Sequence, residues 1–350
     1  MNQYYNTTYR SSCPSQSSYF SSSDYVSTSV HIVTSISIPL SLYGSYCVIK
    51  ITPKQLKNAK WALLNVHLWT VVLDIVFNVL SLPFLFFPSV SGIMLGYGQY
   101  IGIPSWFLLY LIQALVSVFA SAAIGLLENR QNALQTRWKI KRRWVRVVIN
   151  ICNYMVACVT VIPPYLEKFD VQAMAMEILK TIPCPVPEFF DPRLFFVTNK
   201  PSLATMLMAI QSIILLPQGT FYVLHTWYHL VYAHSSRVSA ETRKMQFRFL
   251  LGSLMQIMIP STVFMNPILY IWFSVNTGYY NQEINNHLIF IVSFHGLLGT
   301  TCMILVHKSY RNHLVRMITL GKFPRQSVIR TNPISVIVSS ARLSVDNYVY

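Results

Sequence analysis

The most constraining feature of this chain is the alternation of seven long apolar stretches with connections that are basic on one side only. The stretches cover residues 28–49, 61–87, 104–127, 145–163, 203–232, 247–275 and 284–306. Each approaches or exceeds the ~20 residues with which an α-helix crosses a bilayer. Of the 27 lysines and arginines, 22 lie after stretches one, three, five and seven. Because positively charged loops stay in the cytoplasm, we expect an external N-terminus and a cytoplasmic C-terminus.

Composition supports this fold class. Hydrophobic residues make up 53% of the chain and charged residues 11%, below the ~25% charged residues of a soluble domain. The net charge of +16 sits in short loops beside apolar spans, which argues against nucleic acid as a partner and favours the lipid bilayer. We therefore predict an all-α seven-helix membrane bundle over residues 28–307. An extracellular tail (1–27) precedes it, and a cytoplasmic tail (308–350) follows, with an amphipathic helix at 309–320.

The cysteines divide between compartments. Cys13 and Cys184 are the two that fall on the predicted external side, where disulfides persist. A bridge between them would tie the N-terminal tail to the loop between spans four and five; the alternative is two free thiols. Asn6 begins the sequence Asn-Thr-Thr, a glycosylation acceptor on the same side.

Five segments resemble one known family. They are TPKQLKNAKWALLNVHLWTVVLD (52–74), LLENR (126–130), PCP (183–185), YYNQEINNHLIFIVSFHG (279–296) and VHKSYR (306–311). In combination they resemble the nematode class H serpentine receptors, and the sibling class I receptors share much of the pattern. The resemblance implies a G-protein-coupled chemoreceptor for a small-molecule cue. It also implies a heterotrimeric G protein as partner, and a place in the plasma membrane of sensory neurons, in their cilia.

The inner end of span three carries the predicted coupling residues. Glu128-Asn129-Arg130 stands where rhodopsin-like receptors have Asp-Arg-Tyr, and Arg142 and Arg143 lie in the basic loop that follows. We expect Glu128, Arg130, Arg142 and Arg143 to contact the G protein. The alternative for Arg130 is an arginine that reaches the lipid headgroups.

Asp74 is the acidic residue that lies within a predicted span. It lies 13 residues from the inner end of span two, ~20 Å deep, and His295 lies 11 residues from the outer end of span seven, ~17 Å deep. A lone carboxylate in hydrocarbon needs a partner. We predict that Asp74 pairs with His295 as a conformational switch. Asn78 and Ser293 lie nearby in the sequence pattern, but neither titrates, so they could only hydrogen-bond to Asp74. The alternative to the pair is a sodium ion or a water cluster bound at Asp74.

Weaker signals suggest a ligand pocket. Gln113, Gln211 and Gln256 lie in spans three, five and six, and they either line a pocket or bond neighbouring helices. We expect no cofactor, no metal and no enzyme activity. His225 and His229 are four residues apart, but aromatic residues interleave with them as in an interfacial belt.

Two other classes of function fit this chain less well. A ligand-gated cation channel of the insect odorant receptor type also has seven spans, but its N-terminus is internal, against the charge pattern. A zinc-dependent intramembrane hydrolase needs more intramembrane acids and histidines than this chain holds.

Overall fold

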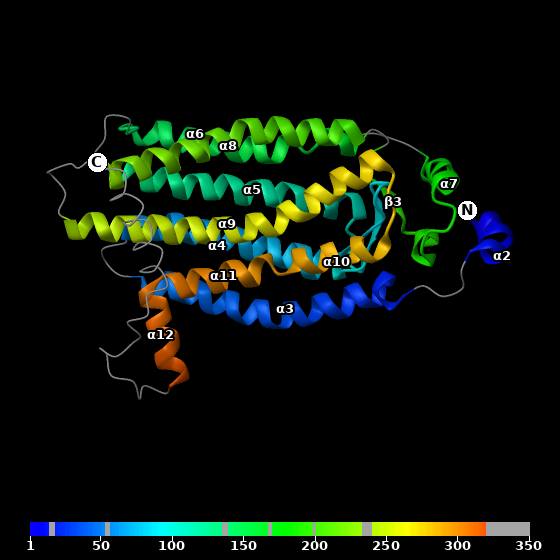
Figure 1. Ribbon diagram of the computed structural model, residues 1–350, viewed down its shortest axis with the longest axis horizontal. Coiled ribbons are helices and arrows are strands. Elements are labelled where there is room, and N and C mark those ends of the chain that lie inside the picture. The colour runs from blue at the N-terminus through cyan, green and yellow to red at the C-terminus, as the bar shows by residue number, and fades with distance from the viewer. Residues whose placement is uncertain are drawn as a thin grey trace, which may run out of the picture.

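The computed structural model describes residues 1–13, 18–52, 57–134, 139–166, 170–198, 201–232 and 240–319. Its body is a bundle of long helices that run roughly along one axis (Figure 1). The bundle helices are α3 (Ser23–Tyr46), α4 (Lys57–Ile75), α5 (Ser105–Asn132), α6 (Arg143–Val159), α8 (Pro201–Val231), α9 (Ala240–Thr277), α10 (Gln282–Ser293) and α11 (His295–Val306). Helix α5 lies centrally and packs on α4, α6 and α8, while α11 packs on α3, α4 and α9.

Five helical segments in the described part of the chain are long and apolar enough to cross a membrane. They are Ser23–Ile51, Ala59–Ser81, Ser105–Asn132, Glu241–Thr277 and Gln282–Val306. These coincide with predicted spans one, two, three, six and seven. Predicted spans four and five correspond to α6, which has 17 residues, and to α8, which has 31.

Helix α4 ends earlier than the hydropathy of residues 61–87 predicts. It continues as a π-helical turn, η5 (Val76–Ser81), and stops at Leu82, whose φ is 40°. Pro83 follows, and a proline restricts the residue before it away from helical angles. The remaining apolar residues form strand β1 (Pro83–Leu85), which pairs antiparallel with β2 (Ser91–Met94), and β2 pairs with β3 (Phe195–Phe196). The apolar run 61–87 therefore forms helix first and then a strand of the sheet.

The sheet belongs to a cap at one end of the bundle (Figure 1). The short helices α1 (Asn2–Tyr4) and α2 (Arg10–Ser12) lie in the same cap, joined by the π-helical η1 (Tyr5–Tyr9). The cap also holds α7 (Val171–Thr181) and the 3-10 turns η2 (Tyr19–Ser21), η6 (Tyr97–Gln99), η7 (Pro163–Leu166) and η8 (Pro187–Phe190). The largest hydrophobic cluster joins this cap to the bundle, with Phe84, Phe86 and Phe189 almost fully buried.

At the opposite end, α12 (Lys308–Ile318) turns away from the bundle axis (Figure 1). It follows α11 after His307 and is held by Tyr310, which is 2% exposed and whose hydroxyl lies 2.7 Å from the hydroxyl of Thr52. Burial raises the pKa of the Tyr310 phenol to about 12. The π-helical turn η3 (Cys47–Ile51) extends α3 to meet it. A helix therefore lies where the sequence predicts one at 309–320; residues 320–350 lie outside the described part.

Candidate functional site

A break in the last bundle helix creates the most polar part of the core. Helix α10 stops at Ser293 and α11 starts at His295, so carbonyl groups near Phe294 lose their helical donors. His295 Nδ1 donates to the Val292 carbonyl at 2.9 Å, and Asn78 Nδ2 donates to the Ser293 carbonyl at 3.2 Å. Such compensation is what a helix broken inside an apolar environment needs. The predicted single span over 284–306 is thus two helices with a polar joint.

Asp74 faces this joint from α4. Its Oδ2 accepts a hydrogen bond from Ser37 Oγ of α3 at 2.5 Å, and its Oδ1 accepts one from Asn78 Nδ2 at 2.8 Å. The backbone of α11 approaches so closely that a Cβ on Gly296 would lie 2.5 Å from Asp74 Cγ. Asp74, Ser37 and Asn78 are all buried. One carboxylate therefore joins α3, α4 and the break between α10 and α11.

His295 lies in the same layer but does not bond Asp74. Its ring packs on Phe264 of α9 at a centroid distance of 5.0 Å and on Phe77 at 6.2 Å. Its Nε2 is buried and has no hydrogen-bond partner among the described residues. The carboxylate oxygens of Asp74 bond Ser37 and Asn78, and Nδ1 of His295 bonds the helix break. The pairing of Asp74 with His295, which similar depth and neighbouring spans predict, stays a prediction. The depth of a residue in the bilayer indicates which residues lie at the same level, but it does not indicate the orientation of their side chains.

The three predicted pocket glutamines contact other helices or lie buried. Gln113 Oε1 accepts from Tyr165 Oη at 2.9 Å, and Gln211 Oε1 accepts from Ser117 Oγ at 3.0 Å. Gln256 is 4% exposed, and its Oε1 has no partner among the described residues. For Gln113 and Gln211 the contacts match the second alternative, side chains that bond neighbouring elements.

A further polar pair lies between α6 and α8, and the sequence analysis did not single it out. Asn153 Nδ2 donates to Gln218 Oε1 at 3.0 Å, and Gln218 Nε2 donates back to Asn153 Oδ1 at 3.2 Å. Ser121 of α5 donates to the Asn153 carbonyl at 3.1 Å. Both amides occur in apolar helices, which is the signal that could have identified them.

The predicted coupling residues separate into buried and exposed groups. Glu128 is 4% exposed and accepts both Nε and Nη2 of Arg146 from α6, at 2.5 and 2.8 Å. This two-bond ion pair links α5 to α6, and both oxygens of the Glu128 carboxylate already accept hydrogen bonds from Arg146. Arg142 and Arg143, at the start of α6, are exposed.

Arg130 has an aromatic partner instead of an acid. Its guanidinium carbon lies 4.0 Å from the centroid of the Phe249 ring of α9, and Nη2 donates to Asn129 Oδ1 at 3.0 Å. Phe249 also packs on the ring of His307, with the two ring centroids 5.2 Å apart. Arg130 Nε and His307 Nε2 are buried without a partner among the described residues. Arg130 of α5 thus packs on Phe249 of α9, which in turn packs on His307 at the end of α11.

The cap contains the predicted external residues. Cys13 and Cys184 are joined as a disulfide, and the hydroxyls of Tyr4 and Tyr9 donate to the carbonyls of Pro183 and Pro185 at 3.1 and 2.7 Å. Burial raises the pKa of the Tyr9 phenol above its usual range. Asn6 is exposed within η1. The N-terminal segment is therefore fastened along the loop between α6 and α8.

The rings of His225 and His229 on α8 are tilted relative to each other, with their centroids 4.5 Å apart. No group of three His, Cys, Asp or Glu side chains able to hold a metal occurs among the described residues.

Apolar helices of membrane-spanning length around a buried polar joint are the architecture of a helical membrane protein. Comparison with known proteins agrees: residues 21–320 match the model of the family described as serpentine type 7TM GPCR chemoreceptor Srh. This chain belongs to that family. It is also 26% identical over 315 residues to serpentine receptor class H-72 of Caenorhabditis elegans, covering 89% of this chain and 90% of the relative. The resemblance to class H receptors is confirmed, because the matching family model and the relative are both of class H rather than class I.

Proposed function

We propose that this protein is a G-protein-coupled chemosensory receptor that detects a small-molecule cue and activates a heterotrimeric G protein. The observation that carries the proposal is the family match over residues 21–320. The ends of α5 and α6 support it, because Arg142 and Arg143 are exposed at the start of α6 and the partly exposed Arg130 lies near the end of α5. We place the receptor in the plasma membrane, with sensory cilia as its site of action.

We further propose that α6 and α8 cross the membrane beside the five clear spans, which makes seven. The N-terminal tail (1–27) is then outside, and α12 lies on the inner leaflet. The bias of 22 basic residues toward one side supports this orientation. The two hydrogen bonds between Asn153 and Gln218 support it too, because each amide satisfies the other inside an apolar bundle.

Epitope tags at both termini test the orientation. On intact cells the N-terminal tag should stain, and the C-terminal tag should stain only after permeabilisation. Staining of the C-terminal tag on intact cells would contradict the proposed topology and the receptor with it.

Signalling is tested by nucleotide exchange on purified G proteins with membranes that contain the receptor, screened against an odorant panel. A cue that drives exchange in the wild type and not in Arg130→Ala, at equal surface expression and ligand binding, supports the proposal. Cue-gated cation current without any G protein would favour the channel alternative instead.

A further inference from the structure

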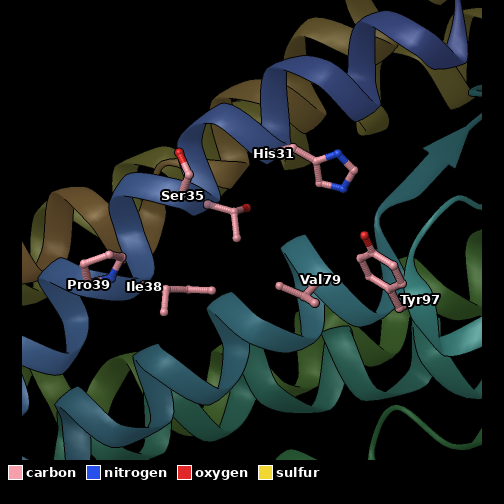
Figure 2. A pocket seen from close by; sticks show the side chains of 7 residues that line it. His31, Ser35, Ile38, Pro39, Val79 and Tyr97 are labelled. Atoms are coloured by element: carbon pink, nitrogen blue, oxygen red, sulfur yellow. The ribbon is translucent and has the colours of Figure 1, made fainter.

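A groove of about 440 Å³ opens sideways between α3 and the end of α4, within the ~300–1,000 Å³ range of small-molecule sites. Its lining includes His31, Ser35, Ile38, Pro39, Val79 and Tyr97 (Figure 2). Thr34 also lines it, but the Thr34 and Ser35 hydroxyls donate to the carbonyls of Val30 and Ile32 in their own helix, both at 2.8 Å. The wall of the groove is therefore mostly apolar.

The two ends of the groove differ in polarity. Figure 2 shows the His31 and Tyr97 rings at one end, and Ile38 and Pro39 at the other. The two rings lie 6.5 Å apart, and neither side chain makes a hydrogen bond among the described residues. Both are exposed, so their nitrogen and oxygen atoms remain free to bind a ligand.

A third polar group lies between these ends. Pro39 has no N–H and cannot donate to the Ser35 carbonyl four residues earlier. Among the described residues no side chain donates to the Ser35 carbonyl, and the Ser35 hydroxyl itself donates to the Ile32 carbonyl instead. Because Ser35 lines the groove and its carbonyl lacks the usual donor four residues later, we take this carbonyl as a candidate acceptor for a ligand with a hydrogen-bond donor.

The depth of the groove matches the edge of a bilayer. His31 precedes Ile49, the last apolar residue before Lys50, by 18 residues, or ~27 Å of helix. The hydrocarbon core is ~30 Å thick, so His31 and Tyr97 lie at its outer boundary. Pro39 lies ~12 Å deeper along α3, within the hydrocarbon. A molecule in the groove would have its polar end at the interface and its aliphatic end in the core.

We propose that this groove binds a single-chain aliphatic alcohol that enters from the outer leaflet. The hydroxyl group donates to His31 or the Ser35 carbonyl and accepts from Tyr97, while the chain lies along Ile38, Val79 and Pro39. A hydroxyl fits better than a carboxylate because the lining holds no permanent cation. The depth argument rests on the proposed membrane spans, but binding here does not require that the site triggers signalling.

Photolabelling of the full-length receptor in lipid nanodiscs tests the proposal. The probe is decan-1-ol with a diazirine at the chain end, and the labelled residues are identified by mass spectrometry. Label should concentrate on α3 and η5 around Ile38 and Val79. Excess decan-1-ol should suppress it, whereas decane and decyl methyl ether, which cannot donate, should not.

Two matched variants separate the groove from ordinary lipid contact. Ile38→Trp fills the groove, while Ile36→Trp places the same ring on the neighbouring lipid-facing surface, where Ile36 is 56% exposed. Labelling should fall several-fold in the first and stay unchanged in the second, with equal melting temperatures. Labelling that spreads equally over Ile32 and Ile36, or that the ether suppresses as well as the alcohol does, would overturn the proposal. Both overturning results would be measured on the wild-type receptor, and neither depends on whether a cue activates a G protein.

Discussion

At the scale of single residues, the close contact between Asp74 and Gly296 decides how α4 meets α11. A Cβ at position 296 would lie 2.5 Å from Asp74 Cγ, nearer than real Cβ contacts allow. Either the carboxylate or the helix break must then move, and both are held by Ser37 and Asn78. The glycine is therefore a requirement of the polar joint.

We predict that Gly296→Ala destabilises the protein by ~1–3 kcal/mol, the usual cost of overpacking a core. The melting temperature of the purified receptor in detergent measures this. Gly219→Ala in α8 is the control, because its Cβ would meet only Ile124 Cγ1 at an ordinary 3.8 Å. An unchanged melting temperature for Gly296→Ala would show that Asp74 is not held as described.

Asp74 should couple more strongly to Ser37 than to His295. Two double-mutant cycles on thermal stability or basal signalling measure this, one with Asp74→Asn and Ser37→Ala and one with Asp74→Asn and His295→Gln. Residues in contact couple by ~0.5–3 kcal/mol, whereas independent sites are additive. Coupling confined to the His295 cycle would instead support the predicted pair of Asp74 and His295.

The contact of Arg130 with Phe249 should hold the inner ends of α5 and α9 together. Phe249→Leu removes the aromatic face, and a buried cation–π contact contributes ~2 kcal/mol. If outward movement of α9 accompanies coupling, basal nucleotide exchange should rise several-fold in this variant. Phe247→Leu is the control, since Phe247 packs on Trp227. Reduced exchange in Phe249→Leu at normal expression would mean that the contact supports the active state.

At the scale of secondary-structure elements, the cap shows how a loop and a tail become one body. The N-terminal segment is fastened to the loop before α8 by the Cys13–Cys184 disulfide and two tyrosine hydroxyls. The loop also reaches the bundle, because Glu188 Oε1 accepts from the Ser23 N–H at the start of α3, at 2.9 Å. Loss of the disulfide should therefore affect the bundle as well as the tail.

We predict that Cys13→Ser and Cys184→Ser each lower surface expression and melting temperature to a similar degree. The double variant should be no worse than either single one, because both remove the same bond. Disulfides contribute ~2–4 kcal/mol, less where helix insertion already restricts the unfolded chain. Cys152→Ser, an exposed free cysteine, is the control. Mass spectrometry without reductant gives the direct test, and two alkylatable thiols at 13 and 184 would contradict the bond.

At the scale of the whole molecule, most of the described lysines and arginines lie at the helix ends near α12, while the cap occupies the other end of the bundle (Figure 1). The buried ion pair Glu128–Arg146 and the stacked Arg130 lie among the exposed cations of the inner ends. The capped end instead carries the groove with its free His31 and Tyr97. This polarity along the axis is consistent with a molecule that receives a ligand at one end and a protein at the other.

Much of this arrangement could be predicted because transfer of apolar helices into a bilayer depends on local composition. The predicted range 28–49 lies within Ser23–Ile51, and the predicted range 104–127 lies within Ser105–Asn132 except for its first residue. The membrane class and the receptor family were predicted correctly from such ranges and from quoted segments. The prediction was wrong for residues 82–87, where an apolar run alone does not distinguish a helix from a buried strand.

The sequence by itself determined that apolar helices cross a bilayer and that their charges favour one side, because hydropathy and charge act at each residue regardless of neighbours. Only the tertiary structure decided that Asp74 bonds Ser37, that Arg146 occupies Glu128, and that Phe249 lies under Arg130. Such partners come from helices that are distant in the chain. Their contact depends on helix rotation, on the break before His295 and on the absence of a side chain at Gly296, all of which are set by packing.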